Sequence, residues 1–363
     1  LIPTILCKKT VRRIYTPRTM ATEHLGERVA VLGSGNTGTM FAWLAARKIR
    51  DLPHYQHKIK WWVFEEVIDG EKLSDLINSN HENVKYLPGK ILPKLVEAVT
   101  NLEVAIAGAT VVIFAIPPQF IRRLLPTIKN KLHPQVKILN VMEGVSFDQG
   151  AFTPYSSIFR SEGQIQASVL GGAFQVQNLE AGEHCEGTIG CEKLETGLVF
   201  KELLESPEFR INVVEDVVGV EMCGILNTAV AIGAGVVDSL DTSQVSKSLY
   251  LRKAFKEIEQ LCQRFFPSIK ASTLLESCGI GDLISKAYGG RNRRCGEVFA
   301  RTGKKWQEIE KELLSGQVLQ GSKIVKQLRD FLDKNEATKD FPCLSKISKV
   351  SFEGENPMVL ISS

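Results

Sequence analysis

Short apolar runs alternate with helical patterns over the first part of the chain. The run R-V-A-V-L breaks at Gly33, and apolar residues then recur at helical spacing from Thr37. Further runs rich in apolar and β-branched residues occupy positions 59–64, 111–116, 136–141 and 168–172. Continuously apolar strands separated by helical stretches are typical of a parallel sheet that helices cover on both faces. The pattern therefore predicts an α/β domain with a doubly wound sheet of the Rossmann type.

The pattern changes near Val217, where helical periodicity takes over. Apolar residues recur at helical spacing in three long segments, 220–235, 249–261 and 306–314. We therefore expect an all-α second domain. The predicted boundaries are 28–215 for the Rossmann-type domain and 216–363 for the helical domain. A ligand is expected in the cleft between the two domains, where such sites usually lie.

The first residues differ in composition from the rest of the chain. Residues 1–20 contain no acid and carry the basic residues Lys8, Lys9, Arg12, Arg13 and Arg18. Met20 is a plausible true start, and the composition is also compatible with a mitochondrial transit peptide. We favour an unstructured leader over residues 1–27.

Composition and charge exclude several classes of protein. The chain has a formal net charge of +4, and its basic residues form no run interleaved with aromatics, so a nucleic-acid partner is not expected. No apolar run reaches the roughly 20 residues that a transmembrane helix needs. The eight cysteines form no C-x-x-C pair, which indicates reduced thiols, no structural metal site and a cytoplasmic protein.

The turn after the first predicted strand has the spacing of a dinucleotide-binding fingerprint. Its residues are Gly33, Ser34, Gly35, Asn36, Thr37 and Gly38. Glycines at this spacing allow a tight turn and a close approach to a pyrophosphate, while the following helix supplies unpaired N–H donors. Glu65 and Glu66 follow the second predicted strand, where an acid binds the adenosine ribose and repels a 2′-phosphate. The predicted cofactor is therefore NAD rather than NADP.

Several longer strings point to a family. They include W-V-F-E-E at 62–66, H-E-N-V-K-Y-L-P-G at 81–89, Y-G-G-R-N-R at 288–293 and G-Q-V-L-Q-G at 316–321. Together with the glycine turn, these strings resemble the eukaryotic NAD-dependent glycerol-3-phosphate dehydrogenases. The resemblance implies a homodimer in which each chain has a Rossmann domain and a helical domain. It also implies that dihydroxyacetone phosphate is reduced by NADH to sn-glycerol 3-phosphate.

The resemblance assigns roles to residues outside the glycine turn. It places five residues at the cofactor, namely Phe64, Phe120, Val176, Arg291 and Gln320. It also places Arg291 and Asn292 at the substrate phosphate, and Asp282 matches the active-site aspartate of the family. An arginine suits a phosphate because its planar fork donates two charge-assisted hydrogen bonds.

The chain departs from the family pattern where the reaction takes place. Asn227 stands where the family has a lysine regarded as the proton donor, and an amide cannot exchange a proton near neutral pH. General acid–base catalysis typically contributes ~10²–10⁴-fold, so that much activity is at stake. Glu143 replaces a second substrate lysine and reverses its charge.

Two lysines near this site are candidates for compensation. Lys286 replaces a small family residue, and it either restores positive charge near Arg291 or pairs with Asp282 at i, i+4 on a helix. We favour the pair. Lys247 is a second candidate for the missing base, although a lysine in this position is more often a solvated helix residue.

Three interpretations of function follow. The first is an active glycerol-3-phosphate dehydrogenase, which the overall resemblance favours. The second is an NAD(H)-binding pseudoenzyme with little or no turnover, which pairs with an active relative in mixed dimers. The loss of two lysines favours this second interpretation. The third is altered specificity, in which Glu143 meets a cationic or neutral carbonyl substrate.

Overall fold

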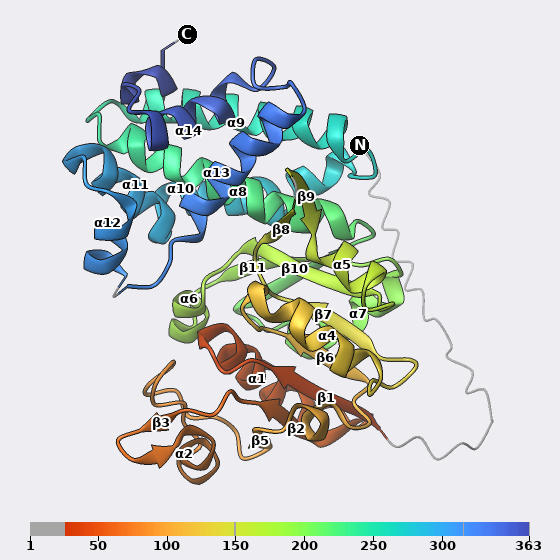
Figure 1. Ribbon diagram of the computed structural model, residues 1–363. Helices are drawn as coiled ribbons and strands as arrows, with labels where there is room; N and C mark the ends of the chain where they lie inside the picture. Colours follow the sequence, from red (N-terminus) through yellow and green to blue (C-terminus); the bar gives the residue numbers. More distant parts are fainter. Residues whose placement is uncertain (1–25, 149, 315, 363) are drawn as a thin grey trace, which may run out of the picture.

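An eight-stranded sheet forms the centre of the first half of the molecule (Figure 1). The computed structural model describes residues 26–148, 150–314 and 316–362, so nearly all of the leader predicted over 1–27 lies outside the described residues. The strand order is β12-β11-β10-β7-β6-β1-β2-β5. The strands are β1 (Glu27–Leu32), β2 (Tyr55–Trp62), β5 (Val96–Val99), β6 (Val111–Phe114), β7 (Lys137–Asn140), β10 (Ala167–Ala173), β11 (Cys185–Gly190) and β12 (Phe209–Val214).

The strands that the sequence predicts are parallel to one another. From β5 through β2, β1, β6 and β7 to β10, every neighbouring pair is parallel. The pattern did not identify β5, β11 or β12. Strands β11 and β12 pair in parallel with each other but run antiparallel to β10. A parallel pair needs a crossover of roughly a dozen residues or more. The connection 174–184 contains only the short helix α6 (Val176–Ala181), and the chain returns antiparallel.

Helices cover both faces of this sheet, as a doubly wound fold requires. On one face α1 (Asn36–Ile49), α2 (Leu73–Asn80) and α7 (Leu194–Leu204) bury apolar side chains against the strands. On the other face the same role falls to α3 (Leu102–Ile106), α4 (Ile121–Lys129) and α5 (Tyr155–Ser161). Two small antiparallel ribbons complete this half, namely β3 (Val67–Ile68) with β4 (Glu71–Lys72) and β8 (Val145–Asp148) with β9 (Ala151–Pro154).

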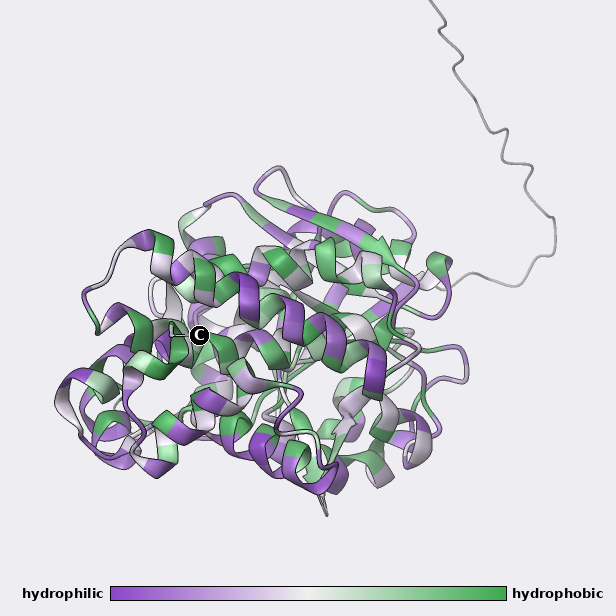
Figure 2. Ribbon diagram, turned by 90° about the horizontal axis from the view of Figure 1, so that it is seen from above, coloured by the Kyte–Doolittle hydropathy of each residue, from purple (hydrophilic) through white to green (hydrophobic). Residues whose placement is uncertain are grey.

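The second half of the chain is helical from Val217 onward, as the periodicity predicts. Its helices are α8 (Val217–Asp238), α9 (Gln244–Phe265), α10 (Asp282–Tyr288), α11 (Gly290–Thr302), α12 (Trp306–Leu313), α13 (Gln320–Lys334) and α14 (Pro342–Glu353). Shorter turns are η2 (Ala271–Leu275), η4 (Pro357–Leu360) and the π-helical turn η3 (Ser277–Gly281), while η1 (Pro118–Phe120) belongs to the sheet domain. Along the outer helices apolar and polar residues alternate, as expected for helices that cover a core (Figure 2).

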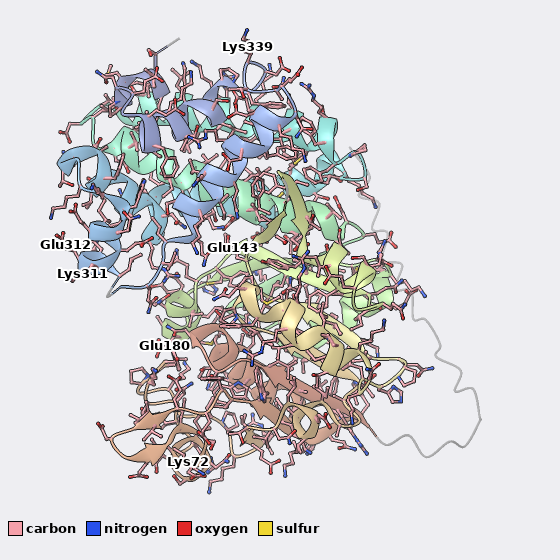
Figure 3. All side chains as sticks on the ribbon, in the orientation of Figure 1. Lys72, Glu143, Glu180, Lys311, Glu312 and Lys339 are labelled. Atoms are coloured by element: carbon pink, nitrogen blue, oxygen red, sulfur yellow. The ribbon has the colours of Figure 1, made fainter. Side chains whose placement is uncertain are left out.

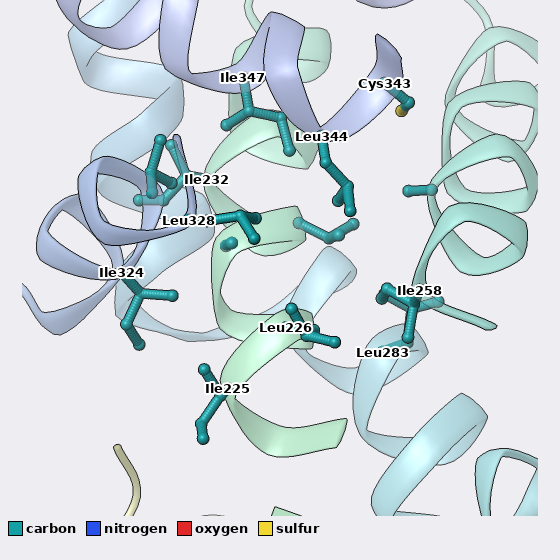
Figure 4. Close-up of a cluster of buried hydrophobic side chains, with 14 of the residues drawn as sticks. Ile225, Leu226, Ile232, Ile258, Leu283, Ile324, Leu328, Cys343, Leu344 and Ile347 are labelled. Atoms are coloured by element: carbon teal, nitrogen blue, oxygen red, sulfur yellow. The ribbon is translucent and has the colours of Figure 1, made fainter. Parts of the chain in front are cut away.

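Helix α8 is the core of the helical domain. It is buried along nearly its whole length and contacts α9, α10, α11 and α13. Its side chains Ile225, Leu226 and Ile232 meet apolar residues of the surrounding helices, such as Ile258 and Leu328 (Figure 4). By length and composition α8 alone among the described helices passes as a membrane span, but 83% of its most apolar stretch is buried inside the molecule. A core helix of a folded domain explains this apolar composition.

Candidate active site

The turn Gly33–Gly38 lies between β1 and α1 and depends on glycine for steric reasons. Gly33 has φ +118°, and a Cβ there would lie 2.3 Å from the carbonyl oxygen of Ala115. A Cβ on Gly38 would lie 1.9 Å from the carbonyl oxygen of Gly33. Both contacts are far too short for real atoms, so only glycine allows the strand to enter the helix here.

The same turn has room for the pyrophosphate of a dinucleotide. A Cβ on Gly35 would meet nothing within 4 Å, so the backbone there is open. Helix α1 has no side-chain cap at Gly35, which leaves its first N–H groups available for an anion. Ser34 is held in place because its Oγ accepts a hydrogen bond of 3.3 Å from the backbone N–H of Phe64. The residues of this turn therefore fit an NAD pyrophosphate.

Two exposed aromatic rings flank the turn. Phe64 follows β2 and Phe120 ends η1 after β6, and both strands are neighbours of β1 in the sheet. Their side chains are 66% and 44% exposed, unusual values for phenylalanine. Exposed rings beside the turn are suited to contact a bound nucleotide. Val176 begins α6 and packs against the hydrophobic core on that side of the sheet.

The acids Glu65 and Glu66, predicted to bind the ribose, are both engaged by protein groups. Glu65 accepts hydrogen bonds from the backbone N–H and the hydroxyl of Ser74 at the start of α2. Glu66 pairs with Lys85 and accepts a hydrogen bond of 2.7 Å from the hydroxyl of Tyr86. Either acid would have to share or exchange a partner to bind a ribose.

The start of α11 brings the helical domain against the sheet domain. A Cβ on Gly290 would lie 3.4 Å from Nε2 of Gln175, at the end of β10. The next residue, Arg291, is exposed, and its guanidinium donates a hydrogen bond of 3.2 Å to Gln317. The amide oxygen of Asn292 accepts one of 3.1 Å from the backbone N–H of Gly321. Asn292 thus holds the first turn of α13, whose first residue is the exposed Gln320.

Asn227 lies on the buried face of α8 and is fully used as a hydrogen-bond donor. Its Nδ2 lies 3.0 Å from Oδ2 of Asp282 and 3.2 and 3.0 Å from the carbonyl oxygens of Cys278 and Gly279. Those carbonyls belong to the π-helical turn η3, a kind of distortion that often occurs at functional sites. Asn227 therefore fastens α8 to the segment that carries Asp282.

Lys286 joins three elements at this point. Its Nζ lies 2.9 Å from Oδ2 of Asp282, so the pair that the sequence favours is present. The same Nζ also pairs with Glu143, a contact that the sequence does not predict, and donates a hydrogen bond to the hydroxyl of Thr228 at 3.0 Å. Glu143 lies where the sheet domain meets the helices (Figure 3). Residues 143, 227, 282 and 286 thus form one charged cluster.

Burial and charge shift the titration of this cluster. Burial raises the pKa of Asp282 to about 6, and the negative charge of Glu143 also raises it. The charge of Lys286 and the hydrogen bond from Asn227 lower this pKa but do not offset the rise. Burial alone would lower the pKa of Lys286, but the carboxylates of Asp282 and Glu143 outweigh it and raise that pKa above its usual value. Lys286 therefore stays protonated near neutral pH.

Two further residues lie outside the cluster. Lys247 pairs with Asp238 at 2.8 Å, and its ammonium lies over the ring of Tyr288, so it is a structural lysine and does not replace the missing base. Phe174 follows β10, and its ring packs edge-on against Phe41 and Phe209 in the core.

An open glycine turn at the carboxyl end of parallel strands, with a charged cluster on a helical domain that contacts the loop after β7, is typical of a two-domain nicotinamide-dependent dehydrogenase. Comparison with known proteins agrees with this class. Residues 28–197 match the model of the NAD-dependent glycerol-3-phosphate dehydrogenase N-terminus, and residues 216–362 match that of its C-terminus. The chain therefore belongs to the NAD-dependent glycerol-3-phosphate dehydrogenase family, whose cofactor is NAD.

Individual relatives match over most of their length. The glycerol-3-phosphate dehydrogenase 1-like protein of Homo sapiens is 39% identical over 336 residues, which cover 92% of this chain and 96% of the relative. The cytoplasmic NAD(+) glycerol-3-phosphate dehydrogenase of Rattus norvegicus is 38% identical, covering 91% of this chain and 95% of the relative. The solved glycerol-3-phosphate dehydrogenase of Saccharomyces cerevisiae superposes with a TM-score of 0.87 at 32% identity, covering 93% of this chain and 100% of that chain.

Proposed function

We propose that this chain interconverts dihydroxyacetone phosphate plus NADH with sn-glycerol 3-phosphate plus NAD. The observation that carries the proposal is that two elements meet at one edge of the sheet. The open glycine turn follows β1, and the segment from Asp282 to Arg291 is brought against Gln175 at the end of β10. A small phosphate ester bound between them would have the cofactor on one side and charged side chains on the other.

The residues at this edge divide the work of binding and catalysis. Bound NADH would supply the hydride. The exposed guanidinium of Arg291 would hold the substrate phosphate, because its fork of donors matches phosphate oxygens. The cluster around Asp282 would face the carbonyl oxygen, on which negative charge develops during reduction.

The test follows NADH oxidation by the full chain with dihydroxyacetone phosphate. We expect turnover within ~10²-fold of ordinary enzymes, whose median is near ~10 s⁻¹. Arg291→Gln should raise KM for the substrate by about 10- to 100-fold, since hydrogen bonds to charged groups contribute ~1.5–3 kcal/mol. Arg294→Gln, an exposed arginine on the same helix, is the matched control and should leave KM within about twofold.

A second candidate function is NAD(H) binding without turnover, in mixed dimers with an active relative. Asn227 and Glu143 support it, because both stand at family lysine positions and both make internal contacts. NADH binding measured by fluorescence, with no NADH oxidation even at high enzyme concentration, would favour this candidate. The same result would contradict the dehydrogenase.

The proposal extends to assembly and compartment. We propose a homodimer in the cytoplasm, the compartment printed in the name of the rat relative. Helices α9 and α10 expose apolar side chains that a second copy would cover, namely Val245, Leu249, Ile284 and Tyr288. Light scattering should give the mass of two chains, and the mass of one chain would contradict the dimer.

A further inference from the structure

Lys286 makes more polar contacts than it has N–H groups. Its Nζ lies 2.9 Å from Asp282 Oδ2 and 3.0 Å from both Gly224 O and Thr228 Oγ1, and it also bonds Oε1 of Glu143. An ammonium has three N–H donors for these four acceptors. No donor is left for an incoming ligand while all four contacts remain.

Of the four acceptors, Glu143 is the one that can leave. Gly224 and Thr228 belong to the buried helix α8, and the Asp282 side chain is only 6% exposed. The Glu143 side chain is 50% exposed and lies in the loop between β7 and β8. Its removal from Lys286 needs a rotation of a side chain that water already reaches and the loss of a 2.9 Å hydrogen bond from the Thr228 hydroxyl. That hydroxyl has a second acceptor in the carbonyl oxygen of Gly224, also at 2.9 Å.

The ammonium of Lys286 and the amide of Asn227 share one acceptor atom. Lys286 Nζ and Asn227 Nδ2 lie 2.9 and 3.0 Å from the same oxygen, Oδ2 of Asp282. The two head groups therefore flank one carboxylate oxygen from neighbouring helices, α10 and α8. A titratable ammonium is present beside position 227 even though position 227 itself holds an amide.

We propose that Lys286 donates the proton to the carbonyl oxygen of the substrate, and that Glu143 must first leave its ammonium to make room for that oxygen. This inference rests on the proposed dehydrogenase function and names the residue that supplies its acid. Glu143 then acts as a displaceable cover on Lys286.

The step balances as follows. The carbonyl carbon of dihydroxyacetone phosphate forms a new C–H bond with a hydride, whose two electrons come from NADH, and NADH is oxidised to NAD. The electron pair of the broken C=O π bond moves to oxygen, which takes a proton from Nζ of Lys286. Lysine is left as a neutral amine and recovers its proton from solvent.

The charges around Lys286 favour this sequence of events. The carboxylates of Asp282 and Glu143 hold the pKa of Lys286 above its usual value and keep the lysine protonated. When Glu143 leaves, one of these two charges is removed, and the pKa of Lys286 falls back toward its usual range. A less basic ammonium gives up its proton more readily.

The first experiment separates proton donation from a structural role. Lys286→Thr should lower kcat by ~10²–10⁴-fold, the usual contribution of a general acid, without changing the Kd for NADH. Lys286→Arg keeps the positive charge and a partner for Asp282 but cannot give up its proton, so kcat should fall as far. Lys304→Gln removes a surface lysine paired with Glu312 and should leave kcat and Tm unchanged.

A rescue variant protects this test against misfolding. The double variant Asn227→Lys with Lys286→Thr moves the ammonium from α10 back to α8. It should recover most of the lost kcat, because the two head groups flank the same oxygen of Asp282. A Lys286→Arg enzyme with wild-type kcat would overturn the proposal.

The second experiment tests the role of Glu143 by ligand binding rather than turnover. Glu143→Gln should tighten binding of glycerol 3-phosphate to the NAD complex about fivefold, because the ligand no longer competes with a half-exposed ion pair. Calorimetry measures this Kd with or without turnover. Unchanged or weaker binding would overturn the part assigned to Glu143.

The outcomes also distinguish this inference from the proposed function. A wild-type chain that binds neither NADH nor glycerol 3-phosphate contradicts the proposed function itself. A wild-type chain that binds both, turns over nothing and gains activity from Asn227→Lys alone shows a sound dehydrogenase site in which Lys286 does not donate. That result overturns the inference and leaves the substrate assignment standing.

Discussion

The glycine turn after β1 and the charged cluster of residues 143, 227, 282 and 286 are built on different principles. The turn is made of backbone, and its geometry depends on the absence of side chains at Gly33 and Gly38. The cluster is made of side chains from the β7–β8 loop, α8 and α10, which place one ammonium between two carboxylates. A turn whose geometry depends on glycine tolerates few other residues. A cluster of charged side chains, in contrast, can receive the same charge from a residue on another helix. The first region therefore follows the family pattern while the second departs from it.

The largest expected effect comes from upsetting the charge balance of the cluster. Asn227→Asp is nearly isosteric, but it replaces the Nδ2 donor by a carboxylate oxygen that only accepts hydrogen bonds. That oxygen would face two carbonyl oxygens and the carboxylate of Asp282. We expect the free energy of unfolding to fall by about 3–5 kcal/mol, the usual cost of a buried charge without a partner. Urea denaturation at neutral pH measures it.

The matched control for this change is Asn212→Asp. The side-chain amide of Asn212 donates a hydrogen bond to Glu276 in an exposed position. The substitution therefore removes only a surface contact. Its cost should stay below about 1 kcal/mol. If both variants lose the same stability, the cluster does not depend on charge balance, and the contrast with the glycine turn fails.

The second prediction addresses the backbone site. In Gly38→Ala the new Cβ would lie 1.9 Å from the carbonyl oxygen of Gly33, so β1 and α1 must separate. We expect a loss of about 1–3 kcal/mol in stability together with loss of NADH binding. Gly35→Ala is the counterpart, because its Cβ meets nothing within 4 Å. That variant should keep its Tm and still lose affinity for NADH, since the methyl group fills space left for the pyrophosphate.

Thermal melts and NADH fluorescence titrations of the two glycine variants provide the measurement. Equal Tm values for Gly38→Ala and the wild type would show that the turn is looser than its geometry indicates. Undiminished NADH affinity in Gly35→Ala would place the pyrophosphate elsewhere.

The smallest expected effect concerns a buried carboxylate held mainly by backbone donors. Glu221 on α8 accepts hydrogen bonds from the backbone N–H groups of Tyr155 and Ser156 and from the Ser156 hydroxyl, and burial raises its pKa to about 7. A carboxyl group whose pKa is higher in the folded than in the unfolded state stabilises the fold at low pH. This contribution is lost as pH rises through the folded pKa.

The wild type should therefore lose stability relative to Glu221→Gln between about pH 4.5 and pH 7, by roughly 1–3 kcal/mol. Urea denaturation of both chains across this range measures the difference. If the difference in free energy of unfolding stayed constant across this range, the backbone donors would hold Glu221 ionised throughout. Backbone groups would then stabilise a buried charge as effectively as charged side chains do.

The sequence predicts those parts of the molecule that depend on local chemistry. The glycine turn, the parallel strands and the start of the helical region at Val217 all follow from residue types that neighbour one another in the chain. The i, i+4 pair of Asp282 and Lys286 is also local, and it is present.

The features that the sequence did not reveal depend on distant segments. Lys286 and Glu143 meet only because α10 packs against α8 and β10, beside the loop that follows β7, and no periodicity in the sequence encodes that contact. The same is true of the carbonyls that Asn227 binds, which are exposed by the π-helical turn of another segment. The sequence offers Lys286 as a compensating charge, but its position beside Asn227, at the same oxygen of Asp282, is recognisable only in three dimensions.

Helix α8 limits how the candidate site can open to a ligand, because it is rigidly held. Its first turn is tied down because Asp216 accepts hydrogen bonds from the backbone N–H groups of Gly219 and Lys270 and from the hydroxyl of Thr273. The rest of the helix is enclosed by its neighbours. Because it is closely packed on all sides, α8 does not bend or slide to admit a ligand. Access to the candidate site therefore depends on the side chains around α8, of which that of Glu143 is half-exposed.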